Sequence, residues 1–181
     1  MTIAPALPIT QSPVTPSPEP VTEAAGVVVG VLERLGVEFA IGVADSQLSD
    51  VLAAIAKQVP LLFAAREDAA VAFAVGMELA GRRSAVFMKN AGLGTSLDSL
   101  ISLAIAAEVP VLLVVGWAGS GRDTLAHHVV MGDRTIALLA AAGIEHDVVR
   151  RSGSPGDVTA FSARAASAAR RHRPYALVVE P

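Results

Sequence analysis

The sequence predicts an α/β protein in which about six parallel strands form one doubly wound sheet with helices on both faces. Short aliphatic runs alternate along the chain with longer segments that carry apolar residues at helical spacing. The short runs are apolar at consecutive positions rather than at every second one, which is typical of parallel strands buried on both faces. Right-handed crossovers between such strands give the flavodoxin-like or Rossmann-like arrangement.

The first half of the chain opens with a helix over residues 21–35, which ends at Gly36, a residue suited to a helix C-terminus. A β-rich run at 38–43 follows, and then a segment at 46–57 with helical spacing. A compact strand is expected at 60–64. The acidic residue Glu67 then opens a helix over 67–80 that stops at Gly81.

The second half continues the alternation. Strands are expected at 84–88, 110–115, 145–149 and 175–179, and helices at 96–107, 134–142 and 158–171. The run at 110–115 is the clearest buried strand. Gly143 is suited to end the helix over 134–142, before the strand at 145–149. The longest loop is expected between residues 116 and 130.

Residues 1–20 differ from the rest, because they hold six of the 11 prolines and no glycine. Spaced prolines remove backbone donors and favour extended conformations, so we expect a disordered tail and a single domain over residues 21–181. The tail lacks the positive segment and the continuous apolar stretch of a signal peptide.

Composition excludes several classes of function. Apolar residues make up 52% of the chain and the mean hydropathy is +0.54, yet no apolar run reaches the roughly 18 residues that span a membrane. The surplus must enter a core or a protein interface. A net charge of −3 argues against nucleic acid and anionic membranes as partners. The absence of cysteine excludes disulfides and thiolate metal sites and fits a reducing compartment, so we expect a cytoplasmic protein.

Candidate site residues follow the strands, since ligands of such sheets bind beyond the carboxyl ends. Glu67 suits the positive end of a helix dipole, but a half-buried carboxylate there could also exchange a proton. Asp45 and Ser46 resemble a helix N-cap. The glycines of Asn90-Ala91-Gly92-Leu93-Gly94 could approach a phosphate, although a tight turn explains them as well.

The pair His127-His128 lies in the longest expected loop. Neutral histidines near a cleft are natural proton donors, whereas a metal would need more ligands than the four histidines of the chain offer at suitable spacing. We therefore expect no metal on this chain. Trp117 and the arginines at helix ends are explained by packing and by solvation.

Together these motifs resemble the pyrimidine-binding (PYR) domain of thiamine-diphosphate decarboxylases that act on phosphonopyruvate and sulfopyruvate. The resemblance covers residues 23–180 and is carried by five motifs in order, namely GVADS (42–46), ARED (65–68), MKNAGLG (88–94), VPVLLVVGW (109–117) and HVVMG (128–132). The length is similar to that of the alpha subunit of the two-chain sulfopyruvate enzymes.

The resemblance implies a role for each matching residue. Glu67 would hydrogen-bond the aminopyrimidine N1′ of thiamine diphosphate and activate the cofactor. Ser46, Asn90 and Gly92 would line the cofactor, and Ser46, Arg66 and Lys89 would contact the substrate. The resemblance further implies that a small 2-oxo acid loses carbon dioxide and that His127, His128 or Asp45 supplies a proton to give an aldehyde.

The sequence departs from the family at three places. Ala44 replaces a common proline, Ala118 replaces a frequent arginine, and residues 124–127 differ from the usual acid-Pro-Gln, so Arg66, Lys89 and Arg122 are the remaining anion partners. The identity of the acid, sulfopyruvate, phosphonopyruvate or another, therefore stays open.

The family motif that holds Mg²⁺ and the diphosphate, Gly-Asp-Gly followed by paired asparagines, has no match here. The resemblance thus implies a beta subunit that carries the diphosphate-binding (PP) domain and Mg²⁺, with the chain homodimerising within a heterotetramer. Two alternatives remain: a carboligase subunit with the same cofactor, and a non-catalytic flavodoxin-like scaffold subunit.

Overall fold

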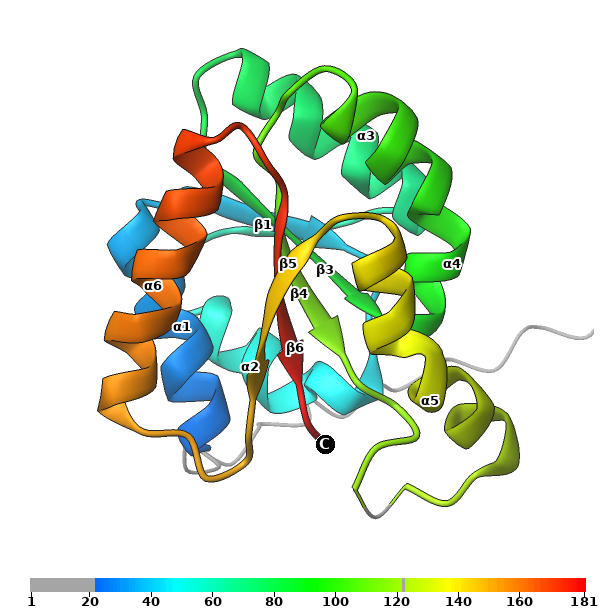
Figure 1. Cartoon of the computed structure of the whole chain (residues 1–181). Coiled ribbons are helices and arrows are strands. Elements are labelled where there is room, and N and C mark those ends of the chain that lie inside the picture. The colour runs from blue at the N-terminus through cyan, green and yellow to red at the C-terminus, as the bar shows by residue number, and fades with distance from the viewer. Residues whose placement is uncertain (1–21, 122) are drawn as a thin grey trace, which may run out of the picture.

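The computed structural model describes residues 22–121 and 123–181. Within them six strands form one all-parallel sheet in the order β2-β1-β3-β4-β6-β5, which confirms the predicted fold class (Figure 1). The strands are β1 Phe39–Gly42, β2 Leu61–Phe63, β3 Ser84–Lys89, β4 Leu112–Gly116, β5 Glu145–Val149 and β6 Tyr175–Val179. The expected tail over residues 1–20 lies outside the described residues, so its disorder stays a prediction.

Helices separate the strands. They are α1 Glu23–Leu35, the short 3₁₀ helix η1 Ser46–Leu48, α2 Ser49–Ile55, α3 Glu67–Leu79, α4 Asn90–Asp98, the π-helical η2 Ser99–Ile105, α5 Ala126–Ala141 and α6 Pro155–Arg170. The side chain of Thr22 caps α1 by accepting a hydrogen bond from the Ala25 N–H, and Gly36 ends it in the left-handed conformation (φ 69°). In the part of the chain that the structure describes, no helix is long and apolar enough to cross a membrane.

Two helices begin earlier than the sequence predicts. Helix α4 starts at Asn90 rather than at residue 96, so the Asn-Ala-Gly-Leu-Gly run is helical and not a tight turn. Helix α5 starts at Ala126 rather than at residue 134, so His127 and His128 lie in its first turn and not in a loop. In both helices a glycine, Gly92 in α4 and Gly132 in α5, lets the helix pack closely against a neighbour.

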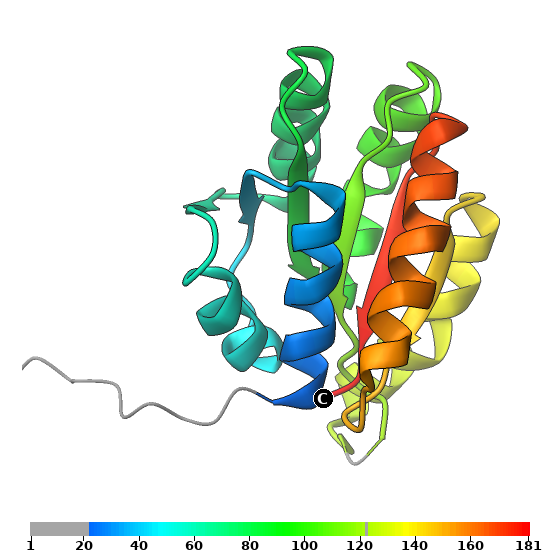
Figure 2. The same cartoon turned by 90° about the vertical axis from the view of Figure 1, so that its left-hand side faces the viewer.

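The sheet is buried between two helical layers. Helices α1, α2 and α6 cover one face, where Phe87, Val114 and Leu177 are fully buried. Helices α3, α4 and α5, with η2, cover the other, where Val86 and Leu113 are fully buried. Figure 2 shows α1 and α6 side by side on the near face. Neighbouring residues of one strand thus enter different cores, which explains the continuous apolar runs.

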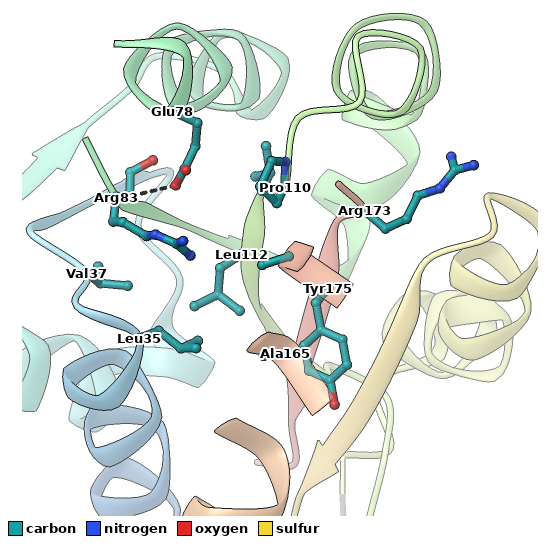
Figure 3. Close-up of a pocket in the computed structure, with 12 residues that line it drawn as sticks. Leu35, Val37, Glu78, Arg83, Pro110, Leu112, Ala165, Arg173 and Tyr175 are labelled. Atoms are coloured by element: carbon teal, nitrogen blue, oxygen red, sulfur yellow. Dashed lines mark hydrogen bonds between the residues drawn. The ribbon is translucent and has the colours of Figure 1, made fainter. Parts of the chain in front are cut away.

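The two edges of the sheet differ in character. At the amino edge, Ser84, Leu112 and Tyr175 line a pocket together with Glu78 (Figure 3). Its cavity volume of about 20 Å³ admits roughly one water molecule. In its lining the Ser84 N–H donates to Glu78 at 3.1 Å, whereas the buried Ser84 Oγ has no partner among the described residues. The predicted site residues lie at the opposite, carboxyl edge, where Figure 1 shows the C-terminus, the loop after β4 and the start of α5 at the same end.

Candidate active site

Glu67 occupies the first turn of α3, directly after the loop that follows β2. Its half-buried side chain lies on the backbone of α4: a Cβ added to Gly92 would lie 2.6 Å from Glu67 Cγ and 3.0 Å from Oε1. Only glycine at position 92 leaves room for the Glu67 side chain. Among the described residues Glu67 makes no hydrogen bond or ion pair, so both carboxylate oxygens are available to a ligand.

Asn90 is fully buried at the start of α4 and ties two other elements together. Its Nδ2 donates to the carbonyl oxygen of Ala118 and to Thr135 Oγ1, both at 2.8 Å. Its Oδ1 is buried and has no partner among the described residues. The side chain therefore joins β3, the loop after β4 and α5, and contact with a cofactor stays a prediction for this residue.

Helix α5 sits unusually close to the loop after β4. A Cβ on Gly119 would lie 1.9 Å from the carbonyl oxygen of His128, and Gly119 has a φ of 82°. A Cβ on Gly132 would lie 2.7 Å from the Gly119 backbone. The Trp117 indole N–H donates to the carbonyl oxygen of Gly132 at 2.9 Å. Trp117 thus acts as a packing and anchoring residue, and the first turn of α5 is held in one position.

This seating brings His128 into a polar network. His128 Nδ1 lies 2.7 Å from Asp123 Oδ2, and His128 Nε2 lies 2.8 Å from Lys89 Nζ at the end of β3. The side chains of His128 and Asp123 are 12% and 10% exposed. The pKa of Asp123 is lowered, first by the hydrogen bond from the Gly119 N–H and then by its bond to His128.

Asp45 follows β1 and is buried, with 8% of its surface exposed. Its Oδ1 accepts a hydrogen bond from the Gln47 N–H at 3.2 Å, so Asp45 caps η1, one residue before the N-cap at Ser46 that the sequence suggested. Its Oδ2 has no partner among the described residues and lies against Gly116. Burial raises the pKa of Asp45, while the Gln47 N–H and the nearby Lys89 act in the opposite direction.

Among the described residues, the other predicted side chains form no hydrogen bond with this network. Ser46 is exposed at the start of η1, and His127 is exposed with its ring 4.3 Å from that of His128. Arg66 is 65% exposed and its guanidinium is paired with Asp68 at 2.8 Å, so binding a substrate anion would require it to exchange that partner. Arg122 lies outside the described residues.

Sequence reasoning missed Asp123 and Gln47. Gln47 Nε2 lies 3.5 Å from Asp123 Oδ2, so it joins η1 to the network. An acidic residue five positions before a histidine was the available signal for Asp123, but no regular spacing links the two across an irregular loop.

The structure brings together Asp45, Lys89, His128 and Asp123 in one group, and Glu67 with Gly92 in another. The first group borders an open depression that Gln47, Asp123 and Arg151 help to line. Residues 22–121 and 123–181 contain no group of three or more His, Cys, Asp or Glu that could hold a metal ion. The two groups contain an unpaired carboxylate (Glu67), a buried acid (Asp45) and a hydrogen-bonded histidine (His128). Side chains of these types can transfer protons in an active site.

Comparison with known proteins decides the family. The family described as "Thiamine pyrophosphate enzyme, N-terminal TPP binding domain" matches residues 22–137, which include Glu67, the α4 glycines and the whole polar network. The chain belongs to this family. The resemblance found in the sequence motifs is therefore confirmed.

Relatives within the family share modest identity with the chain. The sulfopyruvate decarboxylase subunit alpha of Methanothermobacter thermautotrophicus is 27% identical over 143 residues, covering 76% of this chain and 87% of the relative. The phosphonopyruvate decarboxylase of Streptomyces viridochromogenes is 31% identical over 160 residues, covering 86% of this chain and 40% of the relative. The chain spans only part of the length of most of these relatives. It covers 32% of the length of a sulfopyruvate decarboxylase of Methanosarcina acetivorans and 87% of the length of the Methanothermobacter subunit.

Solved structures show the same fold. The thiamine diphosphate-dependent 4-hydroxybenzoylformate decarboxylase of Rhodococcus jostii superimposes with a TM-score of 0.68 at 17% identity, covering 87% of this chain and 30% of that one. The family fold is thus present as one domain of a longer enzyme in that protein.

The contact between Glu67 and Gly92 predicts a specific coupling. Gly92→Ala should destabilise the chain by about 1–3 kcal/mol, because the new methyl group overlaps Glu67 Cγ. Gly94→Ala is the matched control: nothing lies within 4 Å of its Cβ, and alanine favours the helix. Chemical denaturation of both variants measures the difference.

A double-mutant cycle identifies the contact itself. In a Glu67→Ala background the overlapping Cγ is gone, so Gly92→Ala should cost much less than in the native background. An equal loss of unfolding free energy in the two backgrounds would show that the Glu67 side chain does not pack against Gly92.

Proposed function

We propose that the chain is the alpha subunit of a thiamine-diphosphate-dependent 2-oxo acid decarboxylase, acting on a three-carbon acid such as sulfopyruvate or phosphonopyruvate and releasing carbon dioxide and an aldehyde. Its membership of the family and the names of its relatives support the cofactor and the reaction class. The observation that carries the proposal is Glu67, whose unpaired, half-buried carboxylate lies on Gly92 at the carboxyl edge of the sheet.

The residues fit the aminopyrimidine end of the cofactor. A carboxyl group that has no internal partner can hydrogen-bond a ring nitrogen, and the surface beside it is kept free of side chains by Gly92. Glu67 would hold the aminopyrimidine N1′ and exchange a proton with it, with Ser46 and Asn90 as further predicted contacts. When bound, thiamine diphosphate supplies a carbon nucleophile for the 2-oxo group and accepts the electrons released when carbon dioxide leaves.

Protons for the product come from the polar network in this proposal. Burial raises the pKa of Asp45, so its carboxyl holds a proton more readily than an exposed aspartate. His128 is held by Asp123 and Lys89, and the exposed His127 lies against it. An acid poised next to the reacting carbon favours protonation and aldehyde release over attack on a second carbonyl, which supports decarboxylation rather than carboligation.

Of the predicted anion partners that the structure describes, Lys89 is better supported than Arg66. Its ammonium group is half-buried at the end of β3 and is held by His128, whereas the Arg66 guanidinium already binds Asp68. A fixed cation beside the site suits a substrate with a second negative group. The distinction between a sulfonate and a phosphonate stays a matter for assay.

A partner chain would complete the site. The relatives named subunit alpha belong, by that name, to enzymes with further subunits. We propose that a beta subunit with the diphosphate-binding domain supplies the diphosphate contacts and Mg²⁺, and that the chain also pairs with a second copy in a heterotetramer.

An exposed apolar surface supports the pairing. Five of the eight large exposed hydrophobic side chains lie on β2, α3 and η2 on the sheet face that α3 covers, namely Leu62, Phe73, Leu79, Ile101 and Leu103. We call this set the α3 patch. Leu79 is 71% exposed, whereas the exposed Phe63 lies on the other face of the sheet, where its ring packs against Phe87. An interface that buries this patch would account for the high apolar content of the sequence.

Glu67→Gln tests the proposed role of the carboxylate. In the chain reconstituted with a diphosphate-binding partner, we expect aldehyde release to fall roughly 100-fold or more, because the amide cannot exchange a proton with the cofactor. A steady-state assay of carbon dioxide and aldehyde measures the loss.

Asp68→Asn provides the matched control, since Asp68 lies in the same helical turn and is paired with Arg66. It should keep the rate within a few fold. An undiminished rate in Glu67→Gln would show that the carboxylate has no part in the mechanism. A complex that binds no thiamine diphosphate would leave only the alternative of a non-catalytic scaffold subunit.

The α3 patch predicts self-association of the isolated chain, with an interface that exceeds about 2,000 Å² in the assembled enzyme. Leu79→Glu combined with Ile101→Glu should shift the sedimentation coefficient to that of a monomer, because buried charges oppose pairing. Val130→Glu, an exposed apolar residue on α5 outside the patch, should not. A native chain that sediments as a monomer would contradict the assignment.

A further inference from the structure

Asp123 is the most heavily bonded acid at the carboxyl edge. Its Oδ2 accepts hydrogen bonds from the Gly119 N–H at 3.0 Å and from Gln47 Nε2 at 3.5 Å, and lies 2.7 Å from His128 Nδ1. Its Oδ1 accepts from the Leu125 N–H at 3.3 Å. These bonds hold the carboxylate in one orientation against the first turn of α5.

The chemistry of Asp123 decides where the proton of His128 lies. A carboxylate can only accept hydrogen bonds, so the close contact at Nδ1 requires a hydrogen on that nitrogen. The backbone donors that converge on Asp123 keep it ionised, since they lower its pKa. A neutral imidazole with hydrogen on Nδ1 has a free lone pair on Nε2.

The second contact is then determined as well. Lys89 Nζ lies 2.8 Å from His128 Nε2, a distance at which one group must donate and the other accept. If both were charged, two donors and two positive charges would face each other. An ammonium group in water keeps its proton to a much higher pH than an imidazolium, so Lys89 is the donor and His128 the acceptor.

We propose that Asp123 is a positioning residue that fixes His128 as the Nδ1–H tautomer and thereby aims its Nε2 lone pair at the Lys89 ammonium group. The inference rests on the proposed function. It assigns the positive charge that faces Asp45 to Lys89. His128 is then a neutral residue that hydrogen-bonds both Lys89 and Asp123. Protonation of His128 would break the contact with Lys89, so His128 acts through Lys89 and does not present an imidazolium to the substrate.

The surrounding backbone supports this arrangement. His128 cannot turn away by moving α5, because Gly119 and Gly132 bring the helix into direct contact with the loop after β4, and the Trp117 indole anchors Gly132. The tautomer is therefore set by Asp123 alone, since no other described group lies within hydrogen-bond distance of Nδ1.

The tautomer can be read directly by ¹⁵N NMR of the full chain with labelled histidines, with the His128 signals assigned by their loss in His128→Gln. At about pH 7 we expect a neutral ring with hydrogen on Nδ1. In Asp123→Ala the preference for Nδ1–H should be lost. Asp133→Ala, which removes an exposed acid from the same helix, should leave the His128 signals unchanged. An Nε2–H tautomer or an imidazolium in the native chain would overturn the proposal without any variant.

Activity supplies the second readout. In the reconstituted enzyme Asp123→Ala should lower kcat/KM roughly 10-fold or more, and Asp133→Ala should not. Full activity in Asp123→Ala after loss of the tautomer would also overturn the positioning role. The two hypotheses fail separately: an inactive native complex with the Nδ1–H tautomer refutes the decarboxylase function, whereas an active complex with another tautomer refutes only this inference.

Discussion

Close approach of helix backbones at the carboxyl edge of the sheet holds the site of this protein together. Gly92 lets α4 lie under the Glu67 side chain, and Gly119 and Gly132 let α5 lie on the loop after β4. Any Cβ at these positions would collide with backbone or with Glu67, so the helices would have to move apart. The fully buried side chain of Asn90 then joins α4 to the loop after β4 and to α5 by hydrogen bonds. The polar groups are therefore positioned by packing, and their hydrogen bonds follow from it.

In the proposed function this arrangement supplies half of an active site. The carboxylate of Glu67 and the network around His128 are complete within the chain, yet both border open surface, and the α3 patch leaves large apolar side chains exposed. In a family defined by a cofactor-binding domain, such a surface suits assembly with further chains. Asp45 is buried with one carboxylate oxygen unpartnered among the described residues, which costs stability in the isolated chain.

Much of this could be predicted from the sequence, for identifiable reasons. The strand at 175–179 matches β6, because consecutive apolar residues bounded by polar turns have few alternative structures. The strand at 145–149 matches β5 as well, although its first three residues are polar. Glu67 was placed correctly because an acid after a strand suits a helix start. The start of α4 was missed because glycine signals a break unless a neighbour approaches closely, which only the tertiary structure shows. The start of α5 was missed because no side-chain cap marks it. Asp123 was missed because its bonds to Gly119, Gln47 and His128 join three separate segments.

A crystal structure of the chain assembled with a diphosphate-binding partner, thiamine diphosphate and Mg²⁺ would test the central claim most directly. We predict that a Glu67 carboxylate oxygen lies within hydrogen-bond distance of the aminopyrimidine N1′, above the Gly92 backbone, with the network of Lys89, His128 and Asp123 facing the reactive carbon. A cofactor bound elsewhere, or a Glu67 side chain turned away from it, would contradict this account.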